Sequence, residues 1–325
     1  RLGLPLIEIA TAPDVQTPDH AQSTARALGA VLRRTRRVRR GLGSIRQDLN
    51  VSIACGDRVE IKGCQDLGWI PRIVRLEMAR QLHFYRLANT LREAAGQDAL
   101  PPDRRSDDPE REALVAEAVA ARFPDVLNDV SSVFASSTSG MVERGLAQGH
   151  VMLALSLPGM AGLLGTKTLD QEGAQLPRLG RELAGAAKLA GVRGVFHSDE
   201  LPAYGITEAE VDGVRSTLLL AQDDAFVLCL APDWQASLAL EAVRNRALLA
   251  HHRLPREVRN VTVSKGAPLD GTTGPMRPLP GGARMYPETD VPPLPLGAER
   301  WVRLSGHLPP SNEERRERLS PAGLS

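Results

Sequence analysis

The segment 39–62, RRGLGSIRQDLNVSIACGDRVEIK, constrains the fold more than any other part of the chain. Polar and apolar residues alternate from Asp48 to Ile53 and again from Arg58 to Lys62, with Cys55-Gly56-Asp57 between the two runs. A period of two is typical of strands with one buried face, and the glycine between the runs marks a turn. The segment therefore predicts an antiparallel β-hairpin with one apolar face and one charged face.

The pairing of this hairpin decides which polar side chains meet. Directly opposed residues of an antiparallel pair share a face, so matching the apolar residues brings Asp48, Asn50, Glu60 and Lys62 together. A three-residue loop would put Ser52 opposite Glu60, and a five-residue loop would put Asn50 there; the sequence leaves both registers open. In either register two carboxylates lie near an amide and three cations, which are Arg46, Arg58 and Lys62. This mixture fits a functional face and an ordinary exposed sheet equally well.

Composition limits the possible functions only broadly. The 325 residues are 42% hydrophobic, which is enough for one large domain or two moderate ones. A formal net charge of +1 provides no bulk attraction for nucleic acid, so local basic patches must carry any such binding. The three cysteines show no metal-site or disulfide spacing and fit a reducing cytosol, so we expect a cytoplasmic protein. No apolar run approaches the length of a membrane span.

The N-terminal region contains an unusual carboxylate and a basic helix end. Glu8 interrupts a short apolar strand expected over Leu4–Ala10, where burial is costly unless a cation pairs with it. Because the chain starts inside this expected strand, we expect an internal fragment of a longer protein. Thr17 and Pro18 start a helix that is expected to run to about Val38. Its predicted end is crowded with six arginines: Arg33, Arg34, Arg36, Arg37, Arg39 and Arg40. They suit the helix dipole as a solvated end, and they are also candidate contacts for RNA phosphates.

Later segments suggest a second folding region. A polar linker at 97–111, which contains the pair Pro101-Pro102, marks a domain boundary, after which helix and strand signals continue to about residue 268. A stretch rich in proline and glycine at 269–293 then carries polar side chains. The run GLLGTKT at 162–168 lacks the adjacent Gly-Lys-Ser/Thr of a phosphate loop, so tight turns explain its glycines better. The spacing in 197–200, HSDE, matches no standard metal site.

Four motifs in order resemble the catalytic subunits of tRNA-dependent amidotransferases, which form the B/E superfamily. They are GLPLIEIATAPD (3–14), RRGLGSIRQDLNVSI (39–53), RVEIKG (58–63) and RPLPGGARMYPETDVPP (277–293). Three segments resemble the archaeal E-type family, the glutamyl-tRNA(Gln) amidotransferases, more closely than the B-type family. Their sequences are IRQDLNVSI, HSDELPAYGIT and ARMYPETDVPP. The resemblance covers nearly the whole chain.

The resemblance implies an α+β fold whose catalytic domain is a cradle built on an antiparallel sheet. On this chain the cradle would span 1–108 and resume at 269–301. Residues 109–268 would form an inserted α+β domain similar to the insertion domain of bacterial aspartyl-tRNA synthetases. Residues 302–325 would begin a helical domain. Part of the cradle and most of the helical and tail domains would be missing, so we expect the fragment alone to be inactive.

The resemblance also implies a reaction, in which ATP and Mg²⁺ serve to convert Glu-tRNA(Gln) to Gln-tRNA(Gln) through a γ-glutamyl phosphate. The implied partners are tRNA(Gln) charged with Glu and an asparaginase-like glutaminase, the D-type component, which supplies ammonia within a heterotetramer. Metal ions would neutralise charge on the transferring phosphoryl group. The matching motif positions give metal ligands at Glu8, Asp48 and Glu60 and catalytic contacts at Arg46, Asn50, Lys62, Arg284 and Glu288. The arginine run at the helix end gives the candidate tRNA contacts, which are Arg36, Arg37, Arg39 and Arg40.

Two other functions compete with this one. A tRNA-binding module of the same assembly, without its own ATP chemistry, would not need the three carboxylates, and all three are present. A relative of aspartyl-tRNA synthetase through the inserted region alone would not need the cradle motifs outside that region. The leading prediction is therefore an amidotransferase enzyme that does not associate with membranes.

Overall fold

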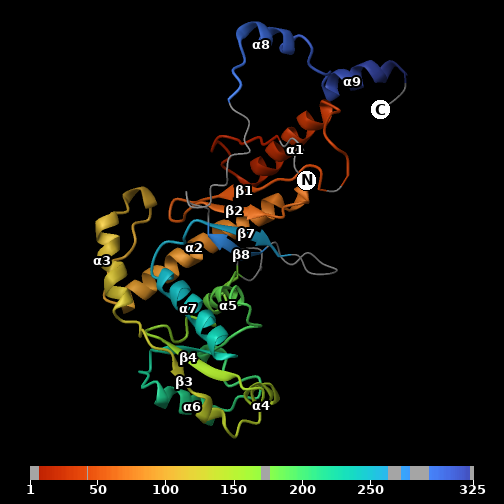
Figure 1. The fold of residues 1–325 in the computed structure, drawn as a ribbon. Helices are drawn as coiled ribbons and strands as arrows, with labels where there is room; N and C mark the ends of the chain where they lie inside the picture. The colour runs from red at the N-terminus through yellow and green to blue at the C-terminus, as the bar shows by residue number, and fades with distance from the viewer. Residues whose placement is uncertain (1–6, 42, 170–175, 263–271, 279–292, 323–325) are drawn as a thin grey trace. The chain divides into compact units, whose positions relative to one another are not determined.

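The computed structural model describes residues 7–41, 43–169, 176–262, 272–278 and 293–322, and within them it contains two four-stranded sheets with helices around them. The chain divides into two compact units (Figure 1). Unit 1 comprises residues 1–47, 63–71 and 279–325, and unit 2 comprises residues 48–62 and 72–278. The predicted α+β class is confirmed.

Unit 1 contains the helices α1 (Pro18–Arg34), α8 (Ala298–Ser305) and α9 (Asn312–Leu319) and the short 3₁₀ turn η1 (Leu67–Trp69). Thr17 starts α1 as predicted, because its hydroxyl accepts a hydrogen bond from His20 N at 3.1 Å. The helix ends before the predicted Val38. Thr35 is its C-cap, and Arg36 adopts a left-handed conformation with φ of 55°, which terminates a helix. The arginines from Arg36 onward therefore follow the helix in irregular chain.

The predicted N-terminal strand is not formed in the part of it that the structure describes. Residues 7–10 lie outside any strand and are exposed, with Ile7 at 80% exposure. A strand requires a hydrogen-bonded neighbour, and none of the described strands pairs with these residues. Residues 1–6 lie outside the described part of the chain.

The first sheet of unit 2 contains the predicted hairpin. Its order is β1 (Leu49–Val51), β2 (Val59–Lys62), β7 (Glu257–Val261) and β8 (Thr273–Pro278). The pairs β1–β2 and β7–β8 are antiparallel, whereas β2 and β7 are parallel. The sheet is therefore mixed and not wholly antiparallel as predicted. The reason is the long connection: β7 follows β2 only after the intervening helices and the second sheet, and parallel neighbours require such a crossover.

The second sheet of unit 2 has the order β3 (Asn128–Asp129), β4 (Val151–Leu157), β6 (Ala225–Ala231) and β5 (Phe196–His197), and all three pairings are antiparallel. The remaining helices of this region are α3 (Pro109–Ala120), α4 (Gly140–Ala147), α5 (Leu179–Lys188), α6 (Glu208–Thr217) and α7 (Asp233–Leu249). β3 is short, because a 3₁₀ turn at Ser131–Phe134 follows it. Thr207 and Glu210 form a capping box at the start of α6.

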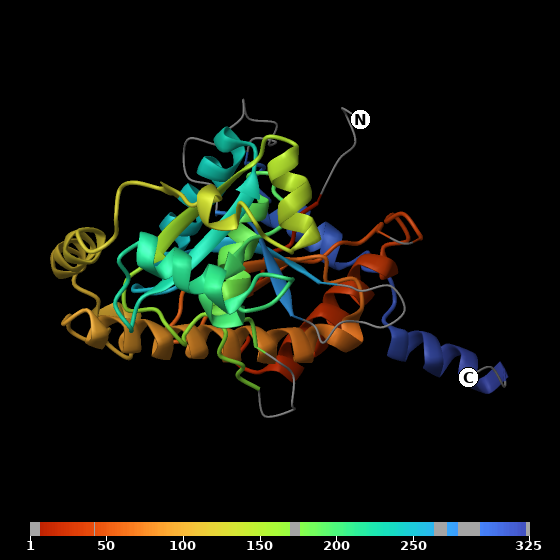
Figure 2. The ribbon, with the colours of Figure 1, turned by 90° about the horizontal axis from the view of Figure 1, so that it is seen from below.

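The long helix α2 (Ile70–Ala94) begins at the boundary of the units and runs along unit 2 toward α3 (Figure 2). Its side chains Phe84, Leu87 and Leu91 belong to one buried cluster with residues of β4, β6, α5 and α7. In Figure 1, α5 and α7 lie between the two sheets of unit 2. The second sheet thus shares one core with α2, α5 and α7. No helix among the described residues has the length and apolar character needed to span a membrane.

Candidate active site

The β1–β2 hairpin adopts the register that the five-residue loop predicted. Asn50 is paired with Glu60, and Leu49 with Ile61 and Val51 with Val59. Val51, Val59 and Ile61 are buried, while Asn50 is exposed. The polar residues of the two strands therefore lie on the face opposite the apolar core, as the alternation predicted.

A side chain of α2 fixes the turn of the hairpin. The Gln81 amide donates to Val51 O at 3.1 Å and its Oε1 accepts from Ile53 N at 3.2 Å, so it replaces strand pairing where β1 ends. Gly56 lies against the same amide, and a Cβ there would be 2.0 Å from Gln81 Oε1. A glycine at this position therefore lets the turn approach α2 closely.

Lys62 connects the two carboxylates of the exposed face. Its Nζ lies 2.6 Å from Asp48 Oδ2 and also forms an ion pair with Glu60 Oε1. The hydrogen bond to Asp48, followed by the one to Glu60, raises the pKa of Lys62 above its usual value, so the ammonium is charged at neutral pH. The three side chains are partly exposed, with Asp48 at 42%, Lys62 at 28% and Glu60 at 22%. The face thus presents a cation and two carboxylates to a ligand.

Asp48 and Glu60 fit Mg²⁺ in chemical type, because both supply hard carboxylate oxygens and both already converge on one cation. Among the described residues, however, no group of three acidic, histidine or cysteine side chains is placed to hold a metal ion. Glu8 belongs to unit 1 and the other two to unit 2, so its convergence with them stays a prediction. Arg46 also belongs to unit 1 and is exposed just before the hairpin. Arg284 and Glu288 lie outside the described residues.

The opposite face of the sheet carries a charged cluster that the sequence did not predict. We call it the buried ionic cluster; its members are Glu77, Arg80, Glu182, Arg246, Glu257 and Arg259. Five of them are buried and Arg246 is half-buried. The Glu257 carboxylate forms ion pairs with Arg259 at 2.8 Å, Arg80 at 3.1 Å and Arg246 at 3.3 Å. Three arginines face three glutamates, so the formal charges cancel.

Glu182 connects this cluster to α5. Its carboxylate lies 2.6 Å from Arg246 and 2.7 Å from Arg259, with Arg80 at 3.7 Å. Burial raises the pKa of Glu182, but the guanidinium groups of Arg259, Arg246 and Arg80 outweigh burial and hold the pKa below its usual range. The carboxylate is therefore ionised, and the cluster joins α2, α5, α7 and β7 behind the candidate site. Alternation within β7 and the spacing Glu77 to Arg80 on α2 are the only local signals for it.

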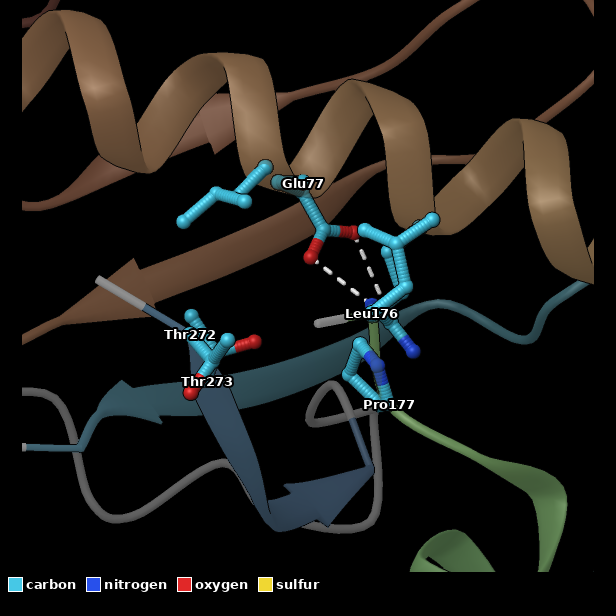
Figure 3. A pocket seen from close by; sticks show the side chains of 7 residues that line it. Glu77, Leu176, Pro177, Thr272 and Thr273 are labelled. Atoms are coloured by element: carbon cyan, nitrogen blue, oxygen red, sulfur yellow. Dashed lines mark hydrogen bonds and ion pairs between the residues drawn. The ribbon is translucent and has the colours of Figure 1, made fainter. Parts of the chain in front are cut away.

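A small cavity adjoins the cluster (Figure 3), between Glu77 on α2 and Thr272–Thr273 at the start of β8, with Leu176 and Pro177 beside it. Its volume, counted for the centre of a water molecule, is about 10 Å³, so it has room for about one water molecule. A nucleotide cannot enter such a space. Arg80 Nη1 is buried beside it and has no hydrogen-bond partner among the described residues. The cavity belongs to the packing of the ionic cluster, and the exposed hairpin face remains the candidate site.

Residues 197–200 serve the local structure. The Asp199 carboxylate accepts hydrogen bonds from Gly162 N at 3.0 Å, Leu164 N at 2.8 Å and Gly165 N at 3.0 Å. The glycine-rich run that imitates a phosphate loop thus binds a carboxylate of its own chain. Glu200 accepts a hydrogen bond from His197 N, although at 3.4 Å. These contacts give the segment a role in holding neighbouring turns.

Five of the six clustered arginines are exposed. Arg33, Arg36, Arg37, Arg39 and Arg40 form no ion pair with any described residue. Arg34 differs, because it is half-buried and its Nη2 donates to Pro309 O at 2.5 Å, which joins the end of α1 to the chain before α9. The exposed five, which we call the α1 arginine cluster, are available to an external polyanion.

Comparison with known proteins places this arrangement in a class. The sequence profile of the GatB/GatE catalytic domain matches residues 1–302, so the chain belongs to the GatB/GatE catalytic-domain family. Within that family it is similar to archaeal proteins named as the E component of glutamyl-tRNA(Gln) amidotransferase. The Methanopyrus kandleri protein is 41% identical over 320 residues, which is 98% of this chain and 45% of the relative. The Thermococcus gammatolerans protein is 43% identical over 318 residues, with the same coverages.

A third relative, from Methanosarcina acetivorans, is 44% identical over 299 residues, which is 92% of this chain and 41% of that protein. The chain spans less than half the length of these curated relatives. The resemblance noted in the sequence motifs is confirmed. What the whole protein does with this domain is a separate inference.

Proposed function

We propose that the chain supplies part of the catalytic face of a carbon–nitrogen ligase that forms Gln-tRNA(Gln) from Glu-tRNA(Gln). In this reaction a γ-carboxylate oxygen of the esterified glutamate attacks the γ-phosphorus of ATP, and ADP leaves. Ammonia from an asparaginase-like glutaminase, the D-type component, then attacks the acyl carbon. The C–O bond to phosphate breaks, phosphate leaves, and the nitrogen loses a proton. The names of the relatives and the family of the domain support this assignment.

One observation carries the proposal for the site: Lys62 holds Asp48 and Glu60 together on an exposed face that a buried core supports from behind. Asp48, Glu60 and, from unit 1, Glu8 would hold Mg²⁺, which neutralises charge on a transferring phosphoryl group. Lys62 would act as a point charge toward phosphate oxygens, because an ammonium has no fixed hydrogen-bonding plane. Asn50 faces the same side and would donate an uncharged hydrogen bond. Arg46, Arg284 and Glu288 are proposed contacts from the motif match alone.

The architecture is part of the proposal. The cradle would comprise residues 1–108 and 269–301, the inserted domain 109–268, and the start of a helical domain 302–325. The second sheet supports the insertion, because all four of its strands fall within 109–268. A likeness of this region to the insertion domain of bacterial aspartyl-tRNA synthetases remains an inference from sequence. Assembly with the glutaminase as a heterotetramer is likewise proposed.

Replacement of Asp48 by Asn in the full-length protein, within its complex, tests the proposal. The variant should lose ATP-dependent formation of Gln-tRNA(Gln) while its thermal unfolding stays cooperative. Asp125→Asn is the matched control, because Asp125 is also an ion-paired aspartate, bound to Arg244 at 2.7 Å in the second part of unit 2. Near-normal activity of a folded Asp48→Asn variant would show that the carboxylate face is structural. A wild-type complex that binds Glu-tRNA(Gln) without ATP-dependent product would favour a tRNA-binding module.

A further inference from the structure

The exposed polar face extends beyond the hairpin onto β7. In the parallel pair β2–β7, Lys62 is the partner of Asn260, and Ile61 is the partner of Arg259. Paired positions of neighbouring strands direct their side chains to the same face of a sheet, and successive residues alternate between faces. Arg259 is on the rear face, because it bonds to Glu182 and Glu257 of the buried ionic cluster. Asn260 therefore lies on the same face as Lys62.

The side chain of Asn260 is available to a ligand. It is exposed, and it makes no hydrogen bond within the described part of the chain. Neighbouring strands are separated by about 4.8 Å, so the backbone of Asn260 lies one strand spacing from that of Lys62. Lys62 forms no hydrogen bond with the Asn260 amide, since its Nζ is bound to Asp48 and Glu60.

The next strand leaves space beside this position. Asn260 is paired with Gly274 on β8, which has no side chain. Among the described atoms, a Cβ added at Gly274 would meet only Thr262 Oγ1, at 3.9 Å. The part of the face around Asn260 can thus accept a ligand group that approaches the strand closely, as glycines in strands often permit.

We propose that Asn260 is a further binding residue of the candidate site and that its amide donates a hydrogen bond to a phosphate oxygen of ATP. An amide suits this place, since it contributes a donor without adding charge beside Lys62 and the two carboxylates. The inference rests on the proposed function, because it assigns the triphosphate to the face that carries Asp48, Glu60 and Lys62. It assigns ATP contact to a strand that the sequence motifs placed in the inserted domain.

The test uses three variants of the full-length protein in its complex: Asn260→Ala, Asn260→Asp and the control Asn245→Asp. Asn245 is exposed on α7, away from this sheet, so the control adds the same charge elsewhere in unit 2. A lost hydrogen bond to a charged oxygen should raise the KM for ATP in Asn260→Ala about 10- to 100-fold. Asn260→Asp should raise it further, because its carboxylate would face the phosphates. The control should not change it.

Direct calorimetric titration with a non-hydrolysable ATP analogue gives a second measurement that does not require turnover. Weaker binding in the order wild type, Asn260→Ala, Asn260→Asp supports the inference. Equal dissociation constants, or the same small change in Asn245→Asp, overturn it while the proposed function stands. If the wild-type complex forms no Gln-tRNA(Gln) with ATP, the proposed function fails instead. Should Asn260→Asp unfold, the alanine variant and Asn260→Gln still decide between these outcomes.

Discussion

Arg259 Nη2 on β7 lies 2.7 Å from Glu182 Oε1 on α5, with both side chains buried. Arg259 also donates to the Thr273 hydroxyl at 2.7 Å and to Thr273 O at 2.9 Å, so one guanidinium holds a helix and the start of β8. The same strand β7 is hydrogen-bonded to β2, whose Glu60 and Lys62 form the candidate site. Residues predicted to belong to an inserted domain thus support the rear of the candidate active-site sheet.

Replacing Glu182 by Gln should destabilise unit 2 strongly. The substitution would leave three guanidinium groups opposite two carboxylates in a buried space, and removal of one partner from a buried ion network costs about 3–5 kcal/mol. Urea unfolding of the purified protein would measure the loss. Glu143→Gln is the control, because Glu143 is exposed on α4 and such changes are usually within about 0.5 kcal/mol of neutral. Equal midpoints for the two variants would show that the cluster is energetically unimportant.

His251 should make the fold sensitive to acid. Burial, together with the smaller effects of His252 and Arg122, lowers the pKa of His251 to about 4 against an opposing hydrogen bond to Ala247 O. The unfolded histidine titrates near 6.5. Between these values the unfolded chain binds a proton that the folded chain does not. Stability should therefore fall as the pH drops from about 6.5 toward 4, by up to about 3 kcal/mol from this group.

The matching variant is His251→Phe, which keeps an aromatic ring beside Phe123, whose centroid lies 5.8 Å from that of His251. At pH 7.5 the free energy of unfolding of this variant should be lower than that of the wild type, because the hydrogen bond between His251 and Ala247 O is lost. The slope of stability against pH between 6.5 and 4 should nevertheless be shallower than in the wild type. Parallel slopes in urea titrations at several pH values would assign the acid sensitivity to other groups.

The sequence predicted local features of the fold well, because they depend on neighbouring residues. The start of α1 at Thr17 follows from cap chemistry, and the shared face of Asn50 and Glu60 follows from side-chain periodicity. The predicted end of α1 was wrong, because a residue in the left-handed conformation carries no sequence signal when it is not glycine, as at Arg36.

Long-range features were not accessible in the same way. Gln81 of α2 binds the backbone where β1 ends, and the sheet continues from β2 to a strand that follows nearly two hundred residues later. The ionic cluster combines side chains from α2, α5, α7 and β7, and each of these charges alone resembles an ordinary surface residue. The sequence therefore identified the polar face of the hairpin, but not its extension to Asn260 or its support from behind.

The predicted inserted domain, residues 109–268, should unfold cooperatively when expressed alone, but less stably than residues 72–278. The longer fragment keeps Phe84, Leu87 and Leu91 in the shared core and keeps Glu77 and Arg80 in the ionic cluster. The shorter fragment lacks these side chains and the pairing of β7 with β8. Calorimetry of both fragments would compare their unfolding temperatures. A shorter fragment without any cooperative transition would contradict the prediction of an independent domain.

The α1 arginine cluster should contribute to tRNA affinity and not to ATP turnover. Residues 1–47 carry nine arginines and three carboxylates, so this part of the sequence is strongly basic although the whole chain is nearly neutral. Replacing Arg36, Arg37, Arg39 and Arg40 by Gln in the full-length complex should weaken tRNA binding. For each phosphate that is no longer neutralised, the slope of log K against log salt concentration should also decrease by about 0.7–0.9.

The structure provides a control for this experiment in the same arginine run. Arg34 is half-buried and bound to Pro309 O, so Arg34→Gln should lower the unfolding temperature by removing that hydrogen bond while the salt slope stays close to that of the wild type. The fourfold variant should show the reverse, a normal unfolding temperature and a slope smaller by about 3 if all four side chains contact phosphates. At saturating Glu-tRNA the rate of ATP-dependent product formation should be unchanged. Every phosphate contact that a protein makes releases counterions and so adds to the salt slope. An unaltered salt slope in the fourfold variant would therefore show that these arginines are exposed to solvent at the end of α1 and contact no phosphate.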